Sequence, residues 1–250
     1  SSYSVTGVQT CALPISRVDF ATLVDWQEKH QLLKVGFELD VLADFARHEI
    51  QYGFVERPTR RNYPQDRARF EVCAHKWTDL SETNFGVALL NDGKYGVDVL
   101  GGDLRLSLVK GGTHPDPRGD AGLHPVTFSL LPHVGPFAAA SVILPAYELN
   151  VAPIVVFGPA EAPRSLVRVD AANVIVEAVK WAEEEDALIL RLYEAEKSAT
   201  VARLDFGLAV AAVAEVNLLE EEPEELELAG SSLLLSFRPF EIKTLKLTLA

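Results

Sequence analysis

Four polar residues stand close together where an apolar run ends: Asn91, Asp92, Lys94 and Tyr95, in the segment Asn-Asp-Gly-Lys-Tyr-Gly. An amide, a carboxylate, an ammonium group and a phenol could hold a small polyhydroxylated ligand, because such ligands need charge-assisted hydrogen bonds and an aromatic ring against their apolar face. Asn-Asp-Gly is also strong turn chemistry. The segment therefore predicts a turn, and a ligand-facing role is a second hypothesis beside it.

Arg105 and Asp116 form a second candidate pair. Arg105 is on the polar side of an alternating segment, and Asp116 lies in the stretch Lys110–Pro125, which is rich in Gly, Pro, Asp and His and is predicted to be a loop. An ion pair between them would order this loop near the site. The alternative is an ordinary surface pair worth about 0–1 kcal/mol. We keep both residues as candidate ligand contacts.

The long loop also invites a metal hypothesis, because four potential ligands cluster in its sequence: His114, Asp116, Asp120 and His124. Their spacing matches no known zinc signature, and a zinc site needs ligands that converge in space. We therefore predict no metal bound by this chain.

Other conspicuous side chains have structural interpretations. Cys73 is expected to be a small buried hydrophobic residue and His75 a packed or satisfied core group. The tryptophans are expected in the core or between sheets rather than as sugar platforms: Trp26, Trp77 and Trp181.

The elements that would position these residues are mostly strands. Short alternating segments punctuated by turn residues are typical of antiparallel sandwiches. In the first part of the chain we expect strands at Gln31–Asp40, Glu49–Val55, Arg69–Trp77, Leu104–Val109 and Val126–Leu131, with a turn at Thr78–Ser81 and an apolar strand before the polar tip. Phe137–Asn150 has helical spacing, but Pro145 limits it to a short or kinked helix.

The second part continues as strands after Val151–Pro163, which reads as a linker with three prolines. Six segments alternate there: Asn173–Trp181, Ala187–Glu194, Thr200–Phe206, Ala212–Leu218, Ser232–Phe237 and Glu241–Leu249. The acidic runs Glu183–Asp186 and Glu220–Glu227 are expected to be a hairpin turn and a solvated loop. The predicted fold is mainly β: an antiparallel, supersandwich-like β-sandwich over residues 17–162, followed by a smaller C-terminal β-sandwich over residues 163–250.

Charge and composition exclude several partners. The net charge of −13 leaves no basic surplus for nucleic acid or for anionic membranes. No apolar run approaches the roughly 20 residues that cross a bilayer. With only Cys11 and Cys73, no disulfide framework exists, so we expect a reducing, cytoplasmic location.

The N-terminus looks foreign to the rest of the chain. The sequence has no Met and begins at Ser1, and its first 16 residues, SSYSVTGVQTCALPIS, lack the charged and apolar regions of a signal peptide. They resemble translated sequencing-adapter read-through. We therefore expect the chain to be a fragment and residues 1–16 to be a disordered tail.

Six phrases in order resemble glycoside hydrolase family 38, the α-mannosidases, in their C-terminal β-rich half. The resemblance is carried by Val24–Val41, Glu49–Asn62, Arg69–Glu82, Phe85–Gly96, Leu104–Pro117 and Arg238–Leu247. The sequence departs from the family pattern at Arg60 and at Gly111–His114, which puts the loop conformations in doubt rather than the membership.

The resemblance implies a retaining enzyme that hydrolyses terminal α-D-mannosyl residues with the help of zinc. Such enzymes need two carboxyl groups about 5 Å apart across the sugar, and the family holds these groups and its zinc ligands in an N-terminal domain. We therefore expect no catalytic residue and no zinc in this chain, which would be inactive alone. Its expected partners are that missing catalytic domain, a mannose-containing oligosaccharide and, through exposed apolar surface, a second copy of itself.

Two other classes of function fit the residues. The chain could be an autonomous carbohydrate-binding β-sandwich with no catalytic partner, or a structural sandwich with no ligand. A contiguous upstream catalytic domain with paired Asp and His ligands would favour the enzyme hypothesis over both.

Overall fold

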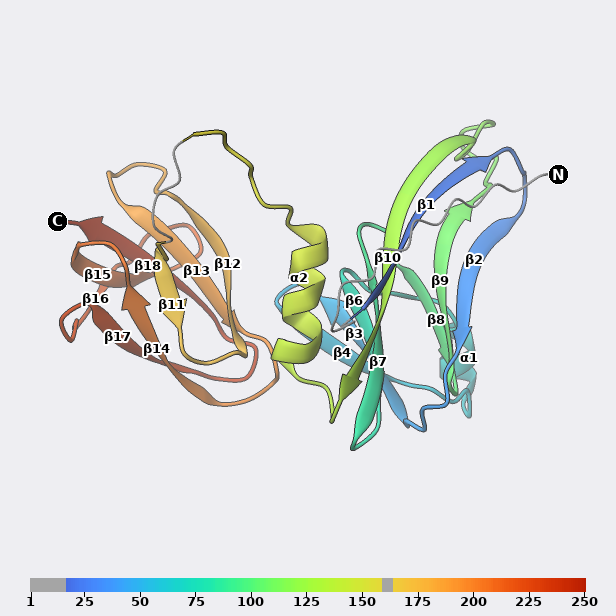
Figure 1. Cartoon of the computed structure of the whole chain (residues 1–250), viewed down its shortest axis with the longest axis horizontal. Coiled ribbons are helices and arrows are strands. Elements are labelled where there is room, and N and C mark those ends of the chain that lie inside the picture. The colour runs from blue at the N-terminus through green and yellow to red at the C-terminus, as the bar shows by residue number, and fades with distance from the viewer. Residues whose placement is uncertain (1–16, 159–163) are drawn as a thin grey trace. The chain divides into compact units, whose positions relative to one another are not determined.

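The computed structural model describes residues 17–158 and 164–250. The chain divides into two compact units, one ending at Pro153 and the other beginning at Ile154 (Figure 1). Antiparallel sheets dominate both units, so the mainly-β prediction is confirmed. The predicted tail at residues 1–16 and the predicted boundary after residue 162 lie outside the described residues.

The first unit contains two antiparallel sheets. The larger has the order β1-β10-β7-β6-β3-β4, and the smaller has the order β2-β9-β8-β5. Their bounds are β1 Val18–Trp26, β2 Leu32–Glu38, β3 Phe45–Ile50, β4 Gly53–Pro58, β5 Val72–Cys73, β6 Trp77–Ser81, β7 Phe85–Asn91, β8 Gly96–Leu100, β9 Asp103–Lys110 and β10 Gly122–Val134.

The core of this unit joins apolar residues of both sheets. Trp26 and Phe128 from the larger sheet share one buried cluster with Leu104 and Leu106 from the smaller. Phe20 stacks on Phe128, with ring centroids 5.1 Å apart. Alternation along each strand supplies these inward side chains, which is why β2 and β9 could be predicted from sequence.

The segment Glu49–Val55, predicted as one strand, is the centre of a hairpin. β3 ends at Ile50, β4 begins at Gly53, and these two residues pair directly across the turn. Tyr52 adopts a φ of 57°, a conformation that glycine normally supplies. Because no glycine or asparagine marks the two-residue turn, the alternation of apolar and polar residues on its two sides predicted a single continuous strand.

The segment Arg69–Ser81 also differs from its prediction. A short helix, α1 (Pro64–Ala68), precedes it, and only Val72–Cys73 forms a strand before β6 begins at Trp77. The polar Thr78–Ser81 stretch, predicted as a turn, is strand. Asp79 is buried there because His133 Nε2 lies 2.8 Å from its Oδ1. The turn instead falls after it, where Glu82 N–H donates to the Phe85 carbonyl.

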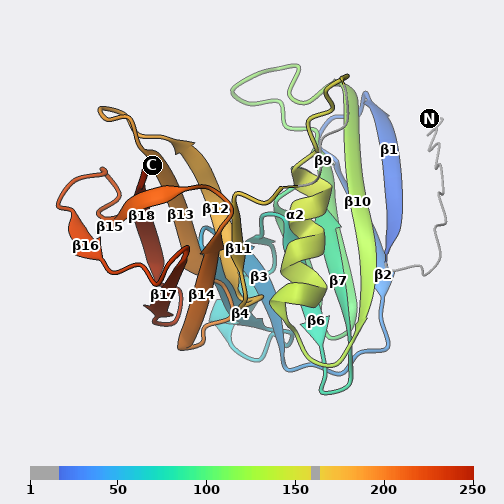
Figure 2. The same cartoon turned by 60° about the vertical axis from the view of Figure 1, so that its left-hand side comes forward.

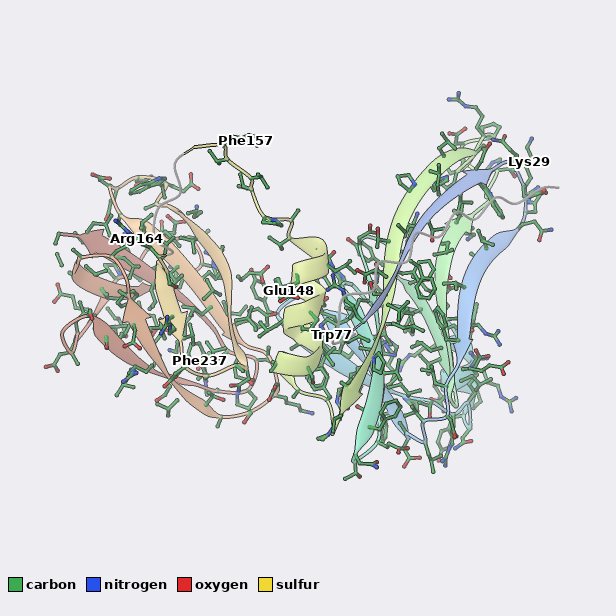
Figure 3. All side chains as sticks on the ribbon, in the orientation of Figure 1. Lys29, Trp77, Glu148, Phe157, Arg164 and Phe237 are labelled. Carbon is green, nitrogen blue, oxygen red and sulfur yellow. The ribbon has the colours of Figure 1, made fainter. Side chains whose placement is uncertain are left out.

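The predicted short helix is present and covers part of the larger sheet. A π-helical turn, η1 (Ala139–Ile143), runs into α2 (Leu144–Asn150), with Pro145 in the first turn of α2. α2 contacts β7, and η1 contacts β6 and β10, as Figure 2 shows for α2. Trp77, labelled in Figure 3, stacks on Phe137 just before this helix, at a centroid distance of 5.0 Å.

The second unit is a sandwich of a three-stranded and a five-stranded sheet, with orders β11-β14-β17 and β12-β13-β18-β15-β16. All six predicted strands are present; β11 was missed, and β16 lies inside the predicted acidic loop. The bounds are β11 Val167–Val169, β12 Val174–Trp181, β13 Leu188–Glu194, β14 Thr200–Phe206, β15 Val210–Val216, β16 Glu224–Leu226, β17 Ser232–Phe237 and β18 Ile242–Leu249. Leu204 and Phe237 of the smaller sheet (Phe237 is labelled in Figure 3) join Leu192 and Leu245 of the larger in one core.

Candidate functional site

The polar tip lies between β7 and β8, and Asn91 shapes it. Asn91 is only 2% exposed. Its Nδ2 donates to the His75 carbonyl at 2.7 Å, and its Oδ1 accepts from the backbone N–H groups of Gly93 at 2.9 Å and Lys94 at 2.7 Å. The predicted turn is therefore present. These partners make Asn91 a positioning residue of the tip; a ligand contact by Asn91 stays a prediction.

Asp92 is exposed but is also tied to the scaffold. Its Oδ2 accepts from Thr127 N–H at 2.9 Å, and its own N–H donates to the Thr127 carbonyl at 3.1 Å. Asp92 thereby anchors the tip to β10. Its side chain borders an open hollow of about 350 Å³ together with residues of β1 and β10. A ligand contact by its remaining oxygen stays a prediction.

Tyr95 presents an aromatic surface, and His75 completes it. The Tyr95 side chain is 51% exposed, and its ring stacks on the His75 imidazole at 4.9 Å with an interplanar angle of 19°. Gln51, in the β3–β4 turn, places its Nε2 3.3 Å from His75 Nε2. We call Gln51, His75 and Tyr95 the tip platform. Its members come from three segments that meet only in the folded chain.

The sequence interpretation missed two of these three residues. His75 was expected to be a packed core group, but it is partly exposed. Gln51 was placed inside a strand, whereas it lies in a turn. A glycine or asparagine in the turn would have made Gln51 a candidate site residue. Nothing in the local sequence pattern predicts the contact of Gln51 with His75.

A partly buried ion pair supports the backbone next to the platform. Lys76, next to His75, has its Nζ 2.8 Å from Glu49 Oε1, and its backbone N–H donates to Glu49 Oε2 at 2.5 Å. The same Nζ lies 4.5 Å from the centre of the Tyr147 ring in α2. Burial raises the pKa of Glu49, and the positive charge of Lys76 opposes that rise. These contacts fix the backbone that carries His75.

Arg105 and Asp116 do not pair with each other. Arg105 forms its ion pair with Asp103, whose carboxylate also raises the pKa of Arg105. Asp116 Oδ1 instead accepts from Arg118 N–H at 2.9 Å inside the loop. The predicted ordering of the loop by this pair is therefore wrong, because a carboxylate two residues from Arg105 is much nearer. Both side chains stay exposed, and their contact with substrate stays a prediction.

The predictions of burial for Cys73 and the tryptophans are confirmed in part. Cys73, expected to be buried, is exposed. Trp26 and Trp77 are buried core residues as predicted, whereas Trp181, at 60% exposed, is not. Over residues 17–158 and 164–250, no group of three or more His, Cys, Asp or Glu side chains is arranged to hold a metal ion. Within the same ranges, no helix is long and apolar enough to cross a membrane.

Two family models match the chain in order along its length. The model for the glycosyl hydrolases family 38 C-terminal domain matches residues 12–118. The model for the family's C-terminal beta sandwich domain matches residues 173–245. The chain belongs to glycosyl hydrolase family 38. One match falls in each unit, and the resemblance to the family's C-terminal part that the sequence predicted is confirmed.

Relatives across 93% of the chain support this membership. The chain is 43% identical to "Alpha-mannosidase 2C1" of Homo sapiens over 240 residues. It is 38% identical to "Alpha-mannosidase G" of Dictyostelium discoideum, and that match includes 92% of the present chain. It spans only 23% and 22% of the lengths of these two relatives.

A solved structure shares the fold. The crystal structure of an alpha-mannosidase from Enterococcus faecalis V583 superposes with a TM-score of 0.77 at 20% identity, covering 93% of this chain and 27% of that chain. At this identity the likeness concerns the fold alone. The family 38 chain described here thus has the architecture found in part of a much longer protein.

Proposed function

We propose that this family 38 chain is the C-terminal part of a retaining α-mannosidase that hydrolyses terminal α-D-mannosyl residues. The observation that carries the proposal is the similarity, over 93% of the chain, to relatives named as α-mannosidases that are about four times longer. The chain would support a catalytic domain and contribute side chains to its sugar site. The cytoplasmic location and self-association predicted from the sequence belong to the same proposal.

Zinc and the reacting carboxylates are assigned to the catalytic domain. Among the described residues no set of His, Cys, Asp or Glu has the convergence that a zinc ion needs. The donor groups of this chain therefore do not fit the metal, and we derive no catalytic step from them. We propose instead that the chain binds and orients the sugar.

The tip platform is the proposed sugar contact. A stacked Tyr95–His75 pair offers a flat surface on which the apolar face of a pyranose ring can lie. The chain next to it supplies Asp92 and Lys94 for hydroxyl groups. Asn91, Glu49 and Lys76 hold the platform through partly buried hydrogen bonds and an ion pair, so the surface is preorganised.

A chimera tests the proposed function. In human alpha-mannosidase 2C1, the matching C-terminal part would be replaced by this chain, and hydrolysis of p-nitrophenyl α-mannoside would be measured. We expect a zinc-dependent enzyme from the chimera and no turnover from this chain alone, with or without zinc. Zinc-dependent turnover by this chain alone, or a folded chimera without activity, contradicts the proposal. An autonomous binding module would bind mannosides but leave the chimera inactive.

The platform itself is tested by Tyr95→Ala in the same chimera. Loss of the stacked ring should lower kcat/KM about tenfold, equivalent to ~1.4 kcal/mol. Tyr95→Phe keeps the ring and should stay within about twofold of the parent. Tyr63→Ala, which removes another exposed tyrosine, at the start of α1, is the control. Unchanged kcat/KM in Tyr95→Ala would exclude the platform as a sugar contact.

A further inference from the structure

An open hollow of about 340 Å³ lies on the side of the tip that carries Lys94. Its polar lining comes from Lys94 in the tip, Lys110 at the end of β9, and Asp120 and His124 at the end of the long loop. Pairing of Gly96 with Ser107 brings β8 and β9 together and so places the two lysines near one another. The hollow has the size of a small-molecule site.

The two lysines of the hollow differ from most lysines of this chain. Five others each have a carboxylate oxygen within 4 Å: Lys34, Lys76, Lys180, Lys243 and Lys246. Lys94 and Lys110 have none among the described residues, although the chain carries a net charge of −13. Lys29 and Lys197 are unpaired as well, but neither lines this hollow. Two unpaired ammonium groups in one hollow of an acidic protein favour an anionic occupant.

The other polar groups around the hollow leave its lining with a net positive charge. The His124 imidazole Nε2 lies 2.6 Å from the Asp120 backbone carbonyl, so the ring is oriented by the main chain. Ser107 donates its hydroxyl to Glu71. Asp120 is the single carboxylate of the lining, against two ammonium groups. Leu108 and Val109, both largely buried, supply an apolar wall.

We propose that this hollow binds a phosphate group, either free or carried by a sugar as a monoester. Two ammonium groups suit a doubly charged phosphate, because lysine binds phosphate as a compact point charge. The apolar wall would take the face of an attached sugar ring, whereas a neutral sugar would leave both ammonium charges uncompensated. The site extends beyond the proposed hydrolase function, and it does not depend on that function.

The test is a titration of the intact, nitrogen-15-labelled chain followed by NMR. The probes are inorganic phosphate, mannose 6-phosphate and methyl α-mannoside, and the reporters are the amides of residues 94, 110 and 120–124. We expect saturable shifts at these amides with both phosphates, weakened by added salt, and none at residues 110 and 120–124 with methyl α-mannoside. Stronger binding of mannose 6-phosphate identifies a sugar-borne phosphate as the source; equal binding of both identifies free phosphate.

Charge-matched variants separate the site from general attraction. Lys94→Gln with Lys110→Gln should weaken phosphate binding about tenfold per lysine removed. Lys29→Gln with Lys197→Gln removes the same charge elsewhere and should leave binding within about twofold; Lys29 is labelled in Figure 3. Equal losses in the two double variants, or no shift with either phosphate, would overturn the proposal. An inactive chimera would contradict the proposed hydrolase function but would leave the result of the phosphate titration unchanged.

Discussion

His48 and Glu49 are neighbours on β3 whose buried side chains titrate abnormally. Burial, with a smaller contribution from the positive charge of Arg57, lowers the pKa of His48 from 6.5 to about 4. Its Nδ1 lies 3.2 Å from Thr78 Oγ1. Burial raises the pKa of Glu49 instead, because the charged form of an acid is the form disfavoured by desolvation. Both residues lie near the end of β3, just before the turn that carries Gln51 of the tip platform.

The low pKa of His48 predicts acid sensitivity. Between pH 6.5 and 4 the unfolded chain binds a proton at His48 that the folded chain does not, so stability falls as the pH is lowered through this window. The loss from this group reaches about 3 kcal/mol below pH 4. His48→Gln should flatten that part of the pH dependence of the urea-unfolding free energy of the first unit. An identical slope in parent and variant would contradict the assignment.

At the scale of elements, the end of β7 links three segments. Asn91 binds the chain before β6 through the His75 carbonyl and closes the tip through the N–H groups of Gly93 and Lys94. The Asn91 carbonyl accepts from Asn150 Nδ2 at 3.0 Å, which ties the end of α2 to the same point. The platform thus depends on an amide that is itself out of reach of solvent.

Asn91→Ala should destabilise the first unit by about 3 kcal/mol, because three partly buried hydrogen bonds of the Asn91 side chain are lost together. Asp92→Ala, which removes an exposed acceptor with one backbone bond, should cost about 1 kcal/mol or less. Thermal unfolding of both variants measures the difference. Equal destabilisation would show that burial of the Asn91 amide does not hold the tip.

At the scale of the whole molecule, each unit has its own core and its own buried polar centre. In the second unit this centre is Glu194, which is fully buried. Its oxygens accept from Asn173 Nδ2 and from the backbone N–H groups of Glu196, Ser198 and Phe240, at 2.7–3.1 Å. One carboxylate therefore holds together three separate loops of the second sandwich.

Glu194→Ala should destabilise the second unit alone, by about 3–5 kcal/mol. Hydrogen exchange measured by mass spectrometry should show faster exchange after residue 164 and unchanged exchange up to residue 153, since each unit is compact by itself. Glu184→Ala, an exposed carboxylate in the same unit, is the control and should change neither. Faster exchange in both units would mean that they unfold together.

The strands that were predicted correctly are those whose apolar residues are the more buried ones and whose polar residues are the more exposed ones, such as β2, β9 and the six strands of the second unit. Prediction failed where a polar residue is buried or where an apparent strand residue forms a turn. Asp79 looks like a turn residue but lies buried in β6 because His133, 54 positions away in the sequence, supplies its partner. Tyr52 looks like a strand residue but turns the chain with a positive φ.

From the residues alone, the mainly-β fold and the turn at Asn91–Gly96 followed, because both depend on short-range pattern and turn chemistry, and the family followed from resemblance to known sequences. Which groups face a common ligand depended on strand pairing across long sequence separations. Folding buries Asn91, brings Tyr95 and Gln51 against His75, and places Lys94 in a hollow with Lys110. Convergence of side chains is a property of tertiary packing, and no local pattern contains it.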